Sequence, residues 1–138
     1  MRHVLLTIMM LAALSFFSCN NNPSTDCDES INCLSTEPLS GNLNIRVSPD
    51  AENPAVVITV YFGQFENGEV YFTDTLTGKS VTYPVYLDQY YSASAKYLSG
   101  QDTVYAIDGD RVDLNYAVNC GYDCWTITEG NLDLRLAK

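Results

Sequence analysis

The chain has 138 residues, with 17 Asp and Glu against 7 Lys and Arg and a formal net charge of −10. Such an acidic chain is repelled by the phosphates of nucleic acids, so we expect no nucleic acid partner. Its one histidine is His3, at the N-terminus. The rest of the chain therefore lacks the residue needed for Ser-His-Asp or Cys-His catalysis and for imidazole-based zinc sites. We expect no enzyme, no metal and no other cofactor.

An apolar run from Val4 to Phe17 follows Arg2 and ends close to Cys19, after which three asparagines begin a polar segment. The run is shorter than the roughly 20 apolar residues that a transmembrane helix needs. A basic start, a short apolar region and small residues near its end predict a secretory signal peptide.

These residues resemble the lipobox of bacterial lipoproteins, with Phe16 in the hydrophobic place, Ser18 in the small place and Phe17 where a small residue is usual. The resemblance implies that residues 1–18 are removed and that acyl chains on Cys19 hold the protein on a membrane. The expected location is the bacterial cell envelope, with the anchor in the outer membrane and the domain in the periplasm or at the cell surface. The alternative is an ordinary secreted protein whose leader is cut near Ser18.

Removal of residues 1–18 would leave 120 residues and, with Arg2 lost, a net charge of −11. This length suits one domain with its own core. We predict a lipidated cysteine and polar tether over residues 19–41 and one β domain over residues 42–138.

Cysteine pairing agrees with an exported chain. With Cys19 assigned to lipid, an even set of four cysteines remains, which suits two disulfides in an oxidising compartment. Local pairs would join Cys27 to Cys33 and Cys120 to Cys124, whereas cross pairs would join one cysteine of the first two to one of the last two. Loop-closure energies do not decide between these connectivities. A redox or zinc motif is the less favoured interpretation, since three residues separate the last two cysteines. The disulfide candidates are Cys27, Cys33, Cys120 and Cys124.

Apolar residues alternate with polar ones along most of the chain after residue 42, and no stretch has helical spacing over three turns. The segment 55–62 is rich in β-branched and aromatic residues, which predicts a central strand buried on both faces. Asn67-Gly68 predicts a hairpin, Asp108-Gly109-Asp110 a turn, and Pro84 an edge strand. The expected strands cover, in chain order, residues 43–47, 55–62, 70–76, 81–87, 91–97, 103–107, 112–118, 125–128 and 132–136.

Seven to nine short strands at intervals of about ten residues predict an all-β fold, a single antiparallel β-sandwich. The pattern resembles immunoglobulin-like, fibronectin III-like and transthyretin-like domains. The whole chain resembles small bacterial lipoproteins of unassigned function, with a lipobox before one β domain and segments such as Tyr90–Tyr97 and Val104–Asp110. That likeness implies no catalytic or binding residue.

Aromatic residues near turns or the edge strand are the candidate ligand contacts, because an amphipathic ring exposed there can touch a sugar or a protein. Tyrosine is also a good strand residue, so a purely structural role is the competing interpretation. The candidates are Tyr83, Tyr90, Tyr122 and Trp125. We therefore expect a lipid-anchored, non-catalytic binding or structural module, with an envelope protein or a glycan as partner.

A cluster of aspartates raises two other hypotheses. Asp108 and Asp110 would serve as paired carboxylates if the protein were a glycan hydrolase rather than a carbohydrate-binding accessory protein. With Asp102 and Asp113 they could also form a calcium site, but the EF-hand spacing is missing and an Asp-Gly hairpin explains the run more simply.

Overall fold

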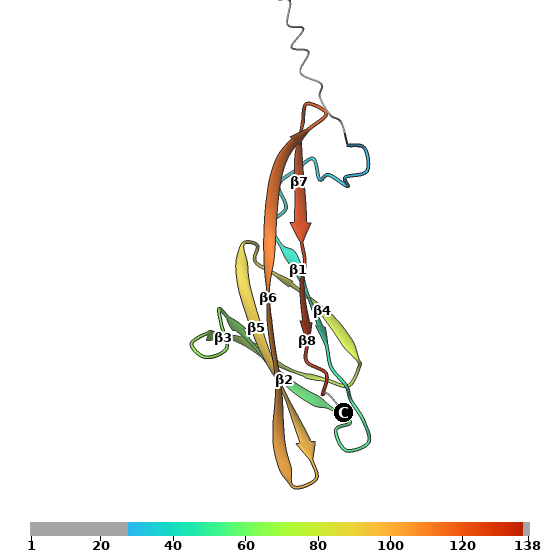
Figure 1. Ribbon diagram of the computed structural model, residues 1–138, viewed down its shortest axis with the longest axis vertical. Coiled ribbons are helices and arrows are strands. Elements are labelled where there is room, and N and C mark those ends of the chain that lie inside the picture. The colour runs from blue at the N-terminus through green and yellow to red at the C-terminus, as the bar shows by residue number, and fades with distance from the viewer. Residues whose placement is uncertain (1–27, 137–138) are drawn as a thin grey trace, which may run out of the picture.

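The computed structural model describes residues 28–136, which form an elongated structure of eight strands with no helix among them (Figure 1). The prediction of an all-β sandwich with seven to nine strands is confirmed. Cys19, Cys27 and the predicted signal peptide lie outside the described residues. Within residues 28–136, no helical segment has the length and apolarity to cross a membrane. The strands are β1 (Gly41–Arg46), β2 (Val56–Phe62), β3 (Glu69–Leu76), β4 (Ser80–Val85), β5 (Gln89–Ser99), β6 (Asp102–Asn119), β7 (Tyr122–Thr128) and β8 (Gly130–Asp133).

The strands form two sheets, one of three strands in the order β4-β1-β8 and one of five in the order β3-β2-β5-β6-β7. All pairs are antiparallel except β1 with β8, which run parallel. Pro84 lies on β4, at the edge of the smaller sheet, as predicted, because a strand with a free edge tolerates a residue without an N–H. The Asn67-Gly68 hairpin is also confirmed, as the connection between β2 and β3.

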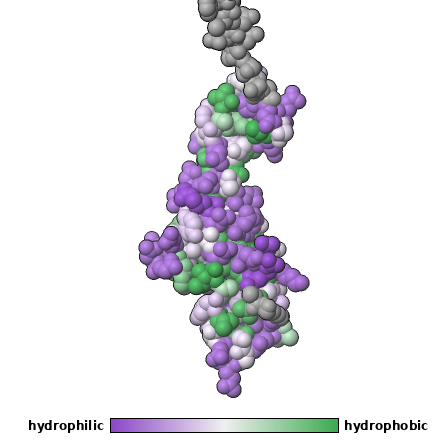
Figure 2. All heavy atoms as spheres, in the orientation of Figure 1, coloured by the Kyte–Doolittle hydropathy of each residue, from purple (hydrophilic) through white to green (hydrophobic). Residues whose placement is uncertain are grey.

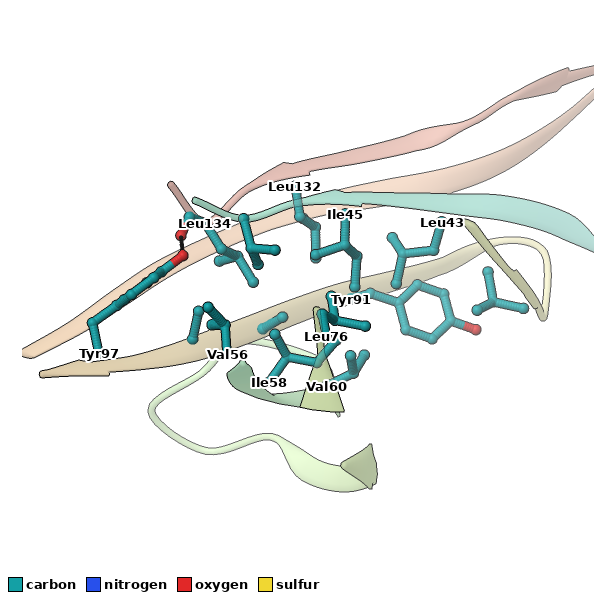
Figure 3. Close-up of a cluster of buried hydrophobic side chains, with 14 of the residues drawn as sticks. Leu43, Ile45, Val56, Ile58, Val60, Leu76, Tyr91, Tyr97, Leu132 and Leu134 are labelled. Carbon is teal, nitrogen blue, oxygen red and sulfur yellow. Dashed lines mark hydrogen bonds between the residues drawn. The ribbon is translucent and has the colours of Figure 1, made fainter. Parts of the chain in front are cut away.

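The core fills the space between the two sheets (Figure 3). The alternating residues predicted to face inward on β1 and β5 are buried, and Tyr91 and Tyr97 are among the largest fully buried side chains. Each of these tyrosine hydroxyls donates to a backbone carbonyl, Tyr91 to Tyr86 and Tyr97 to Leu134. The core is thus closed without an unsatisfied buried side-chain group within the described residues.

The prediction for β2 was wrong in one respect. Its inward residues are fully buried, but Val57 on the other face is 41% exposed. Burial on both faces is found instead on the neighbouring strand β5, where residues 91–95 are all buried.

The predicted turn at Asp108-Gly109-Asp110 does not exist, because these residues lie within β6, a strand of 18 residues. Residues 102–112 of β6 pair with β5, and residues 113–119 pair with β7. Gly109 fits a strand here because the ring of Tyr90 lies over it: a Cβ at position 109 would stand 2.4 Å from the Tyr90 hydroxyl oxygen. An aromatic ring on the neighbouring strand covers the space that a glycine leaves in a sheet.

Asp108 and Asp110 face the interior side of β6 and serve the edge of β8. Asp108 Oδ2 accepts the backbone N–H of Asp133 at 2.7 Å, and Asp110 Oδ2 accepts that of Asn131 at 2.9 Å. β8 pairs with β1 on its other side, so these carboxylates bind amides that no strand pairs. They join the two sheets along this edge.

Beyond the sandwich, β6 and β7 continue as a two-stranded hairpin (Figure 1). We call residues 113–128 together with the segment 28–34 the stalk. The hairpin turns at Cys120-Gly121, both with positive φ, the geometry of a two-residue turn that matches strand twist. Leu34 and Trp125 exchange two backbone hydrogen bonds of 2.9 and 3.0 Å, so the segment 28–34 pairs with β7 on the side away from β6.

The stalk joins the sandwich where β1, β6 and β8 approach closely. A Cβ on Gly41 would stand 2.4 Å from a methyl of Val112, and one on Gly130 would stand 2.8 Å from a methyl of Leu43. Real Cβ atoms do not come this close, so both glycines are required by packing.

We expect Gly41→Ala to destabilise the fold by about 1–3 kcal/mol, the usual cost of adding a methyl group to a packed core. Gly78→Ala is the matched control, because its nearest neighbour would lie 3.9 Å away. Urea unfolding measures both variants. A Gly41→Ala variant as stable as Gly78→Ala would contradict the close approach of β1 and β6.

Candidate functional site

Tyr90, one of the four candidate aromatic residues, lines a hollow of the surface. This hollow, the tyrosine pocket, has a volume of about 320 Å³ and lies on the outer face of the five-stranded sheet, beneath the β2–β3 connection. Phe65 contributes a second ring, and Gln64 and Glu66 supply polar groups. Its lining consists of Gln64, Phe65, Glu66, Tyr90, Ser92, Ile107, Asp108 and Gly109.

Tyr83 has a structural environment. Its hydroxyl donates to Asp74 Oδ2, and its ring packs on Phe72 with centroids 4.7 Å apart. Burial, followed by the hydrogen bond to Asp74, raises the pKa of Tyr83 well above its usual range, while that hydrogen bond lowers the pKa of Asp74. Because Tyr83 is on β4 and Asp74 on β3, the pair connects the two sheets.

Tyr122 and Trp125 lie together on the stalk, away from Tyr83 and Tyr90. Tyr122 is 78% exposed beside the hairpin turn. The Trp125 ring packs on Tyr116 with centroids 4.6 Å apart. Figure 2 shows hydrophobic surface at this end of the molecule, and Val118 on the same hairpin is 65% exposed.

Cys33 and Cys124 form a disulfide, with Cα atoms 4.8 Å apart and a separation of 91 in sequence. This is a cross pair, one of the two kinds of connectivity that the sequence left open. Cys120 is also disulfide-bonded. Next to the Cys33–Cys124 bond, the Asn119 side chain donates to the carbonyl of Asp28 at 2.8 Å and accepts its N–H at 3.1 Å.

The two aspartates proposed as a hydrolase pair are each occupied by backbone groups. Besides its bond to β8, Asp108 accepts the N–H of Gly109, and Asp110 accepts that of Arg111, both at 2.8 Å. These contacts are those of structural carboxylates. In residues 28–136 there is also no group of three or more His, Cys, Asp or Glu side chains placed to hold a metal ion.

A second hollow, not anticipated from the sequence, gathers positive charge at the end of β1 away from the stalk. This cationic pocket has a volume of about 410 Å³. Three of the five Lys and Arg among residues 28–136 line it, and no carboxylate does. Its lining consists of Arg46, Val47, Ser48, Pro49, Lys79, Ser80 and Arg135.

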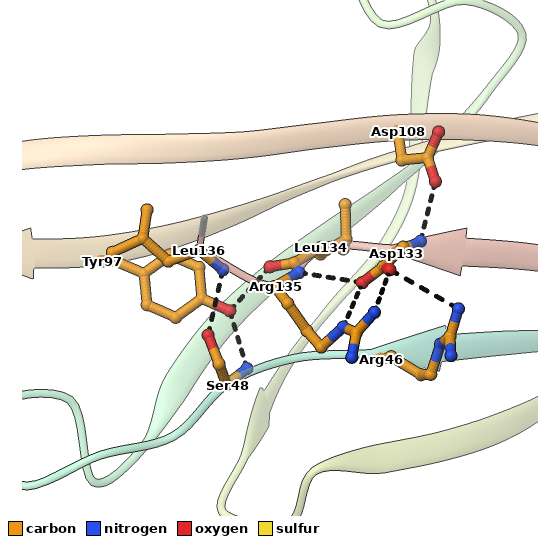
Figure 4. Close-up of polar contacts among 8 residues, drawn as sticks. All are labelled: Arg46, Ser48, Tyr97, Asp108, Asp133, Leu134, Arg135 and Leu136. Atoms are coloured by element: carbon orange, nitrogen blue, oxygen red, sulfur yellow. Dashed lines mark hydrogen bonds and ion pairs between the residues drawn. The ribbon is translucent and has the colours of Figure 1, made fainter. Parts of the chain in front are cut away.

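Asp133 contacts the guanidinium groups of both Arg46 and Arg135 (Figure 4). Arg135 makes a two-pronged contact with it, Nε to Oδ1 at 2.7 Å and Nη2 to Oδ2 at 2.5 Å, and Arg46 Nη2 lies 3.5 Å from Oδ2. The hydrogen bond from Arg135, with a smaller charge effect from Arg46, holds the pKa of Asp133 at about 2. Among the described residues, the Lys79 ammonium has no ion-pair partner.

The wall of the cationic pocket is fixed by the buried hydroxyl of Tyr97 (Figure 4). This hydroxyl donates to the Leu134 carbonyl at 2.7 Å and accepts the N–H of Ser48 at 3.1 Å. The Ser48 hydroxyl in turn accepts the N–H of Leu136 at 3.0 Å. The chain on both sides of Arg135 is therefore bound to the residues that follow β1.

Sequence reasoning missed this pocket because its cations are far apart in the chain. Arg46 and Ser80 are cross-strand partners, and the Val47 N–H donates to the Lys79 carbonyl. Only the strand pairing brings these residues together. The sequence shows that Lys and Arg are scarce in this acidic chain, but not that three of them lie around one pocket.

No family model, curated protein or solved structure matches the chain. The resemblance to immunoglobulin-like, fibronectin III-like or transthyretin-like domains therefore stays a prediction.

We expect Asp133 to titrate with a midpoint near pH 2. A lowered pKa means that folding favours the ionised form, so this contribution to stability is present above the ordinary value of 3.8 and is lost as the pH falls through about 2. Carboxyl-carbon NMR measures the midpoint directly. Arg135→Gln should raise it toward 3.8, whereas Arg111→Gln, which removes a different ion pair, should leave it unchanged. A midpoint near 3.8 in the unsubstituted chain would contradict this geometry.

Proposed function

We propose that this protein is a non-catalytic binding module of the bacterial cell envelope, anchored to a membrane through acyl chains on Cys19. In this arrangement most of the length of the domain is held away from the membrane. The observation that carries the proposal is the attachment of the segment 28–34 to the β6–β7 hairpin by the Cys33–Cys124 disulfide. Whatever precedes Asp28 must therefore join the molecule at the stalk end, opposite the cationic pocket.

The length of the preceding segment supports this orientation. Nine peptide units separate Cys19 from Asp28, and fully extended they span at most about 32 Å. An anchor at Cys19 would thus keep the stalk within that distance of the bilayer, and the sandwich would project beyond it. The disulfide also stabilises the fold, because closing a loop of about 90 residues in the unfolded chain costs that state roughly 4.5 kcal/mol of conformational free energy.

A non-catalytic role is supported by the side chains available. The one histidine is in the predicted leader, and the two aspartates that could have formed a hydrolytic pair are bound to backbone amides. A carboxylate that must move protons at a glycosidic bond needs its oxygens accessible to substrate.

Carbohydrate binding is the second candidate, and the tyrosine pocket favours it. A sugar ring can stack on the exposed face of an aromatic ring, while the oxygens of side-chain amides and carboxylates accept hydrogen bonds from the sugar hydroxyls. Tyr90 and Phe65 supply rings there, and Gln64 and Glu66 supply polar groups.

Metabolic labelling with an alkyne fatty acid tests the anchor in cells that express the full chain. We expect label on the unsubstituted protein and recovery in the membrane fraction, with both lost in Cys19→Ser. Cys33→Ser is the control: it removes the disulfide but should keep label and membrane recovery. Unlabelled protein, or label that persists in Cys19→Ser, would refute the anchoring.

Retention of the purified full chain on immobilised envelope glycans tests the second candidate. Tyr90→Ala should weaken retention several-fold, because it removes a ring of the tyrosine pocket. The Tyr122→Ala, Trp125→Ala double variant tests the stalk aromatics in the same way. Loss only in the double variant would move the ligand site to the stalk, and unchanged retention in both would rule out these aromatic contacts.

A further inference from the structure

We propose that the cationic pocket binds a phosphomonoester group, with Lys79, Arg46 and Arg135 as its charged contacts. The inference goes beyond the anchoring and rests on three observations: the convergence of cations in an acidic protein, the hollow that they line, and the fixed geometry of the wall behind them.

The local charge suits a dianion. Three cations face one carboxylate, Asp133, which leaves a surplus of two positive charges in a chain whose net charge is −10. A phosphomonoester carries about −1.5 to −2 near neutral pH. A carboxylate ligand would fit less well, because it carries only one negative charge. The two-pronged contact of Arg135 that would suit a carboxylate is also already made with Asp133.

Enough donors remain for a tetrahedral group. A guanidinium has five N–H donors, and Asp133 takes two of those of Arg135 and one of those of Arg46. The Lys79 ammonium brings three more, and the Ser80 hydroxyl lines the same hollow. Guanidinium and ammonium groups together are the usual ligands of phosphate oxygens.

The pocket is also preorganised. Asp133 holds both guanidinium groups, and the Tyr97 hydroxyl ties Ser48 to the backbone of Leu134. Side chains that are already ordered lose less entropy when a ligand binds. An anion arriving here therefore meets charges that are in place.

The position of the pocket selects among phosphate sources. Its lining residues Arg46–Pro49 stand at the end of β1, and Figure 1 shows that β1 runs away from the stalk. This step rests on the proposed anchoring at the stalk end, under which a lipid of the anchoring membrane would be out of reach of the pocket. We infer a soluble or glycan-borne phosphomonoester rather than a phospholipid headgroup.

NMR titration with glucose 6-phosphate tests the proposal on the full chain isolated from cells, with its cysteines oxidised, in an uncharged detergent at constant ionic strength. We expect saturable shifts of the Ser48 and Ser80 amides at pH 7.5. Glucose and acetate should bind at least tenfold more weakly. The second pKa of a phosphomonoester is about 6, so binding should weaken at pH 5, where the phosphate gains a proton and loses one negative charge.

Lys79→Ala should weaken binding about tenfold, the usual effect of losing one charged contact. Its matched control is Lys96→Ala, which removes the same charge from the outer face of the five-stranded sheet. Equal weakening by both variants would mean that the anion responds only to the net charge of the protein, and this result would contradict a site at Lys79. Absence of saturable shifts, or acetate binding as tightly as the phosphate, would overturn it as well.

Sedimentation with vesicles distinguishes the source. The protein should not sediment with phosphatidic acid vesicles beyond its recovery with phosphatidylcholine vesicles, and excess sedimentation that Lys79→Ala abolishes would overturn the assignment to a soluble source. If the chain isolated from cells carried no lipid on Cys19 but still bound glucose 6-phosphate, the phosphomonoester site would stand, while the anchor and the positional argument against a phospholipid would both fall. If the chain carried lipid but showed no saturable binding, the anchor would stand and the site would fall.

Discussion

The unbroken course of β6 through Asp108, Gly109 and Asp110 is the constraint on which the rest of the structure depends. Because the strand does not turn there, its first part completes the five-stranded sheet and its second part leaves the sandwich as the stalk. Because a strand alternates its faces, both aspartates point toward β8 and bind its amides. Tyr90 covers the glycine between them and lets the ladder with β5 continue. One strand therefore closes the sandwich and builds the stalk.

The stalk gives the molecule a direction. Residues 28–34 are bound to its hairpin by backbone hydrogen bonds and by the Cys33–Cys124 disulfide, and β1 then runs from the stalk to the cationic pocket. Residues 28–34 and the cationic pocket thus lie at opposite ends of the described structure. Under the proposed anchoring, the pocket would face away from the membrane.

The sequence predicted what depends on alternation and missed what depends on register. Alternation predicts strands over residues 43–47 and 91–97, and Leu43 and Tyr97, on the apolar faces of these strands, are fully buried. Asp-Gly predicts a turn by local rules, and no local rule indicates that the ring of Tyr90 on β5 covers Gly109. The convergence of Arg46, Lys79 and Arg135 depends on which strands pair across the sheet, and that information is not contained in any short segment of the chain.

A distance along β6 tests the central claim most directly. Spin labels attached to unnatural ketone amino acids at Gln101 and Tyr122 leave the cysteines oxidised, and both positions are exposed. Tyr122 pairs with Asn119 at the end of β6, so 18 residues of strand separate the two positions. For a continuous strand, the rise of about 3.3 Å per residue then predicts a separation of roughly 50–60 Å by pulsed electron resonance. A chain that turned at Asp108-Gly109-Asp110 would bring the labels within about 25 Å, and that result would contradict the structure described.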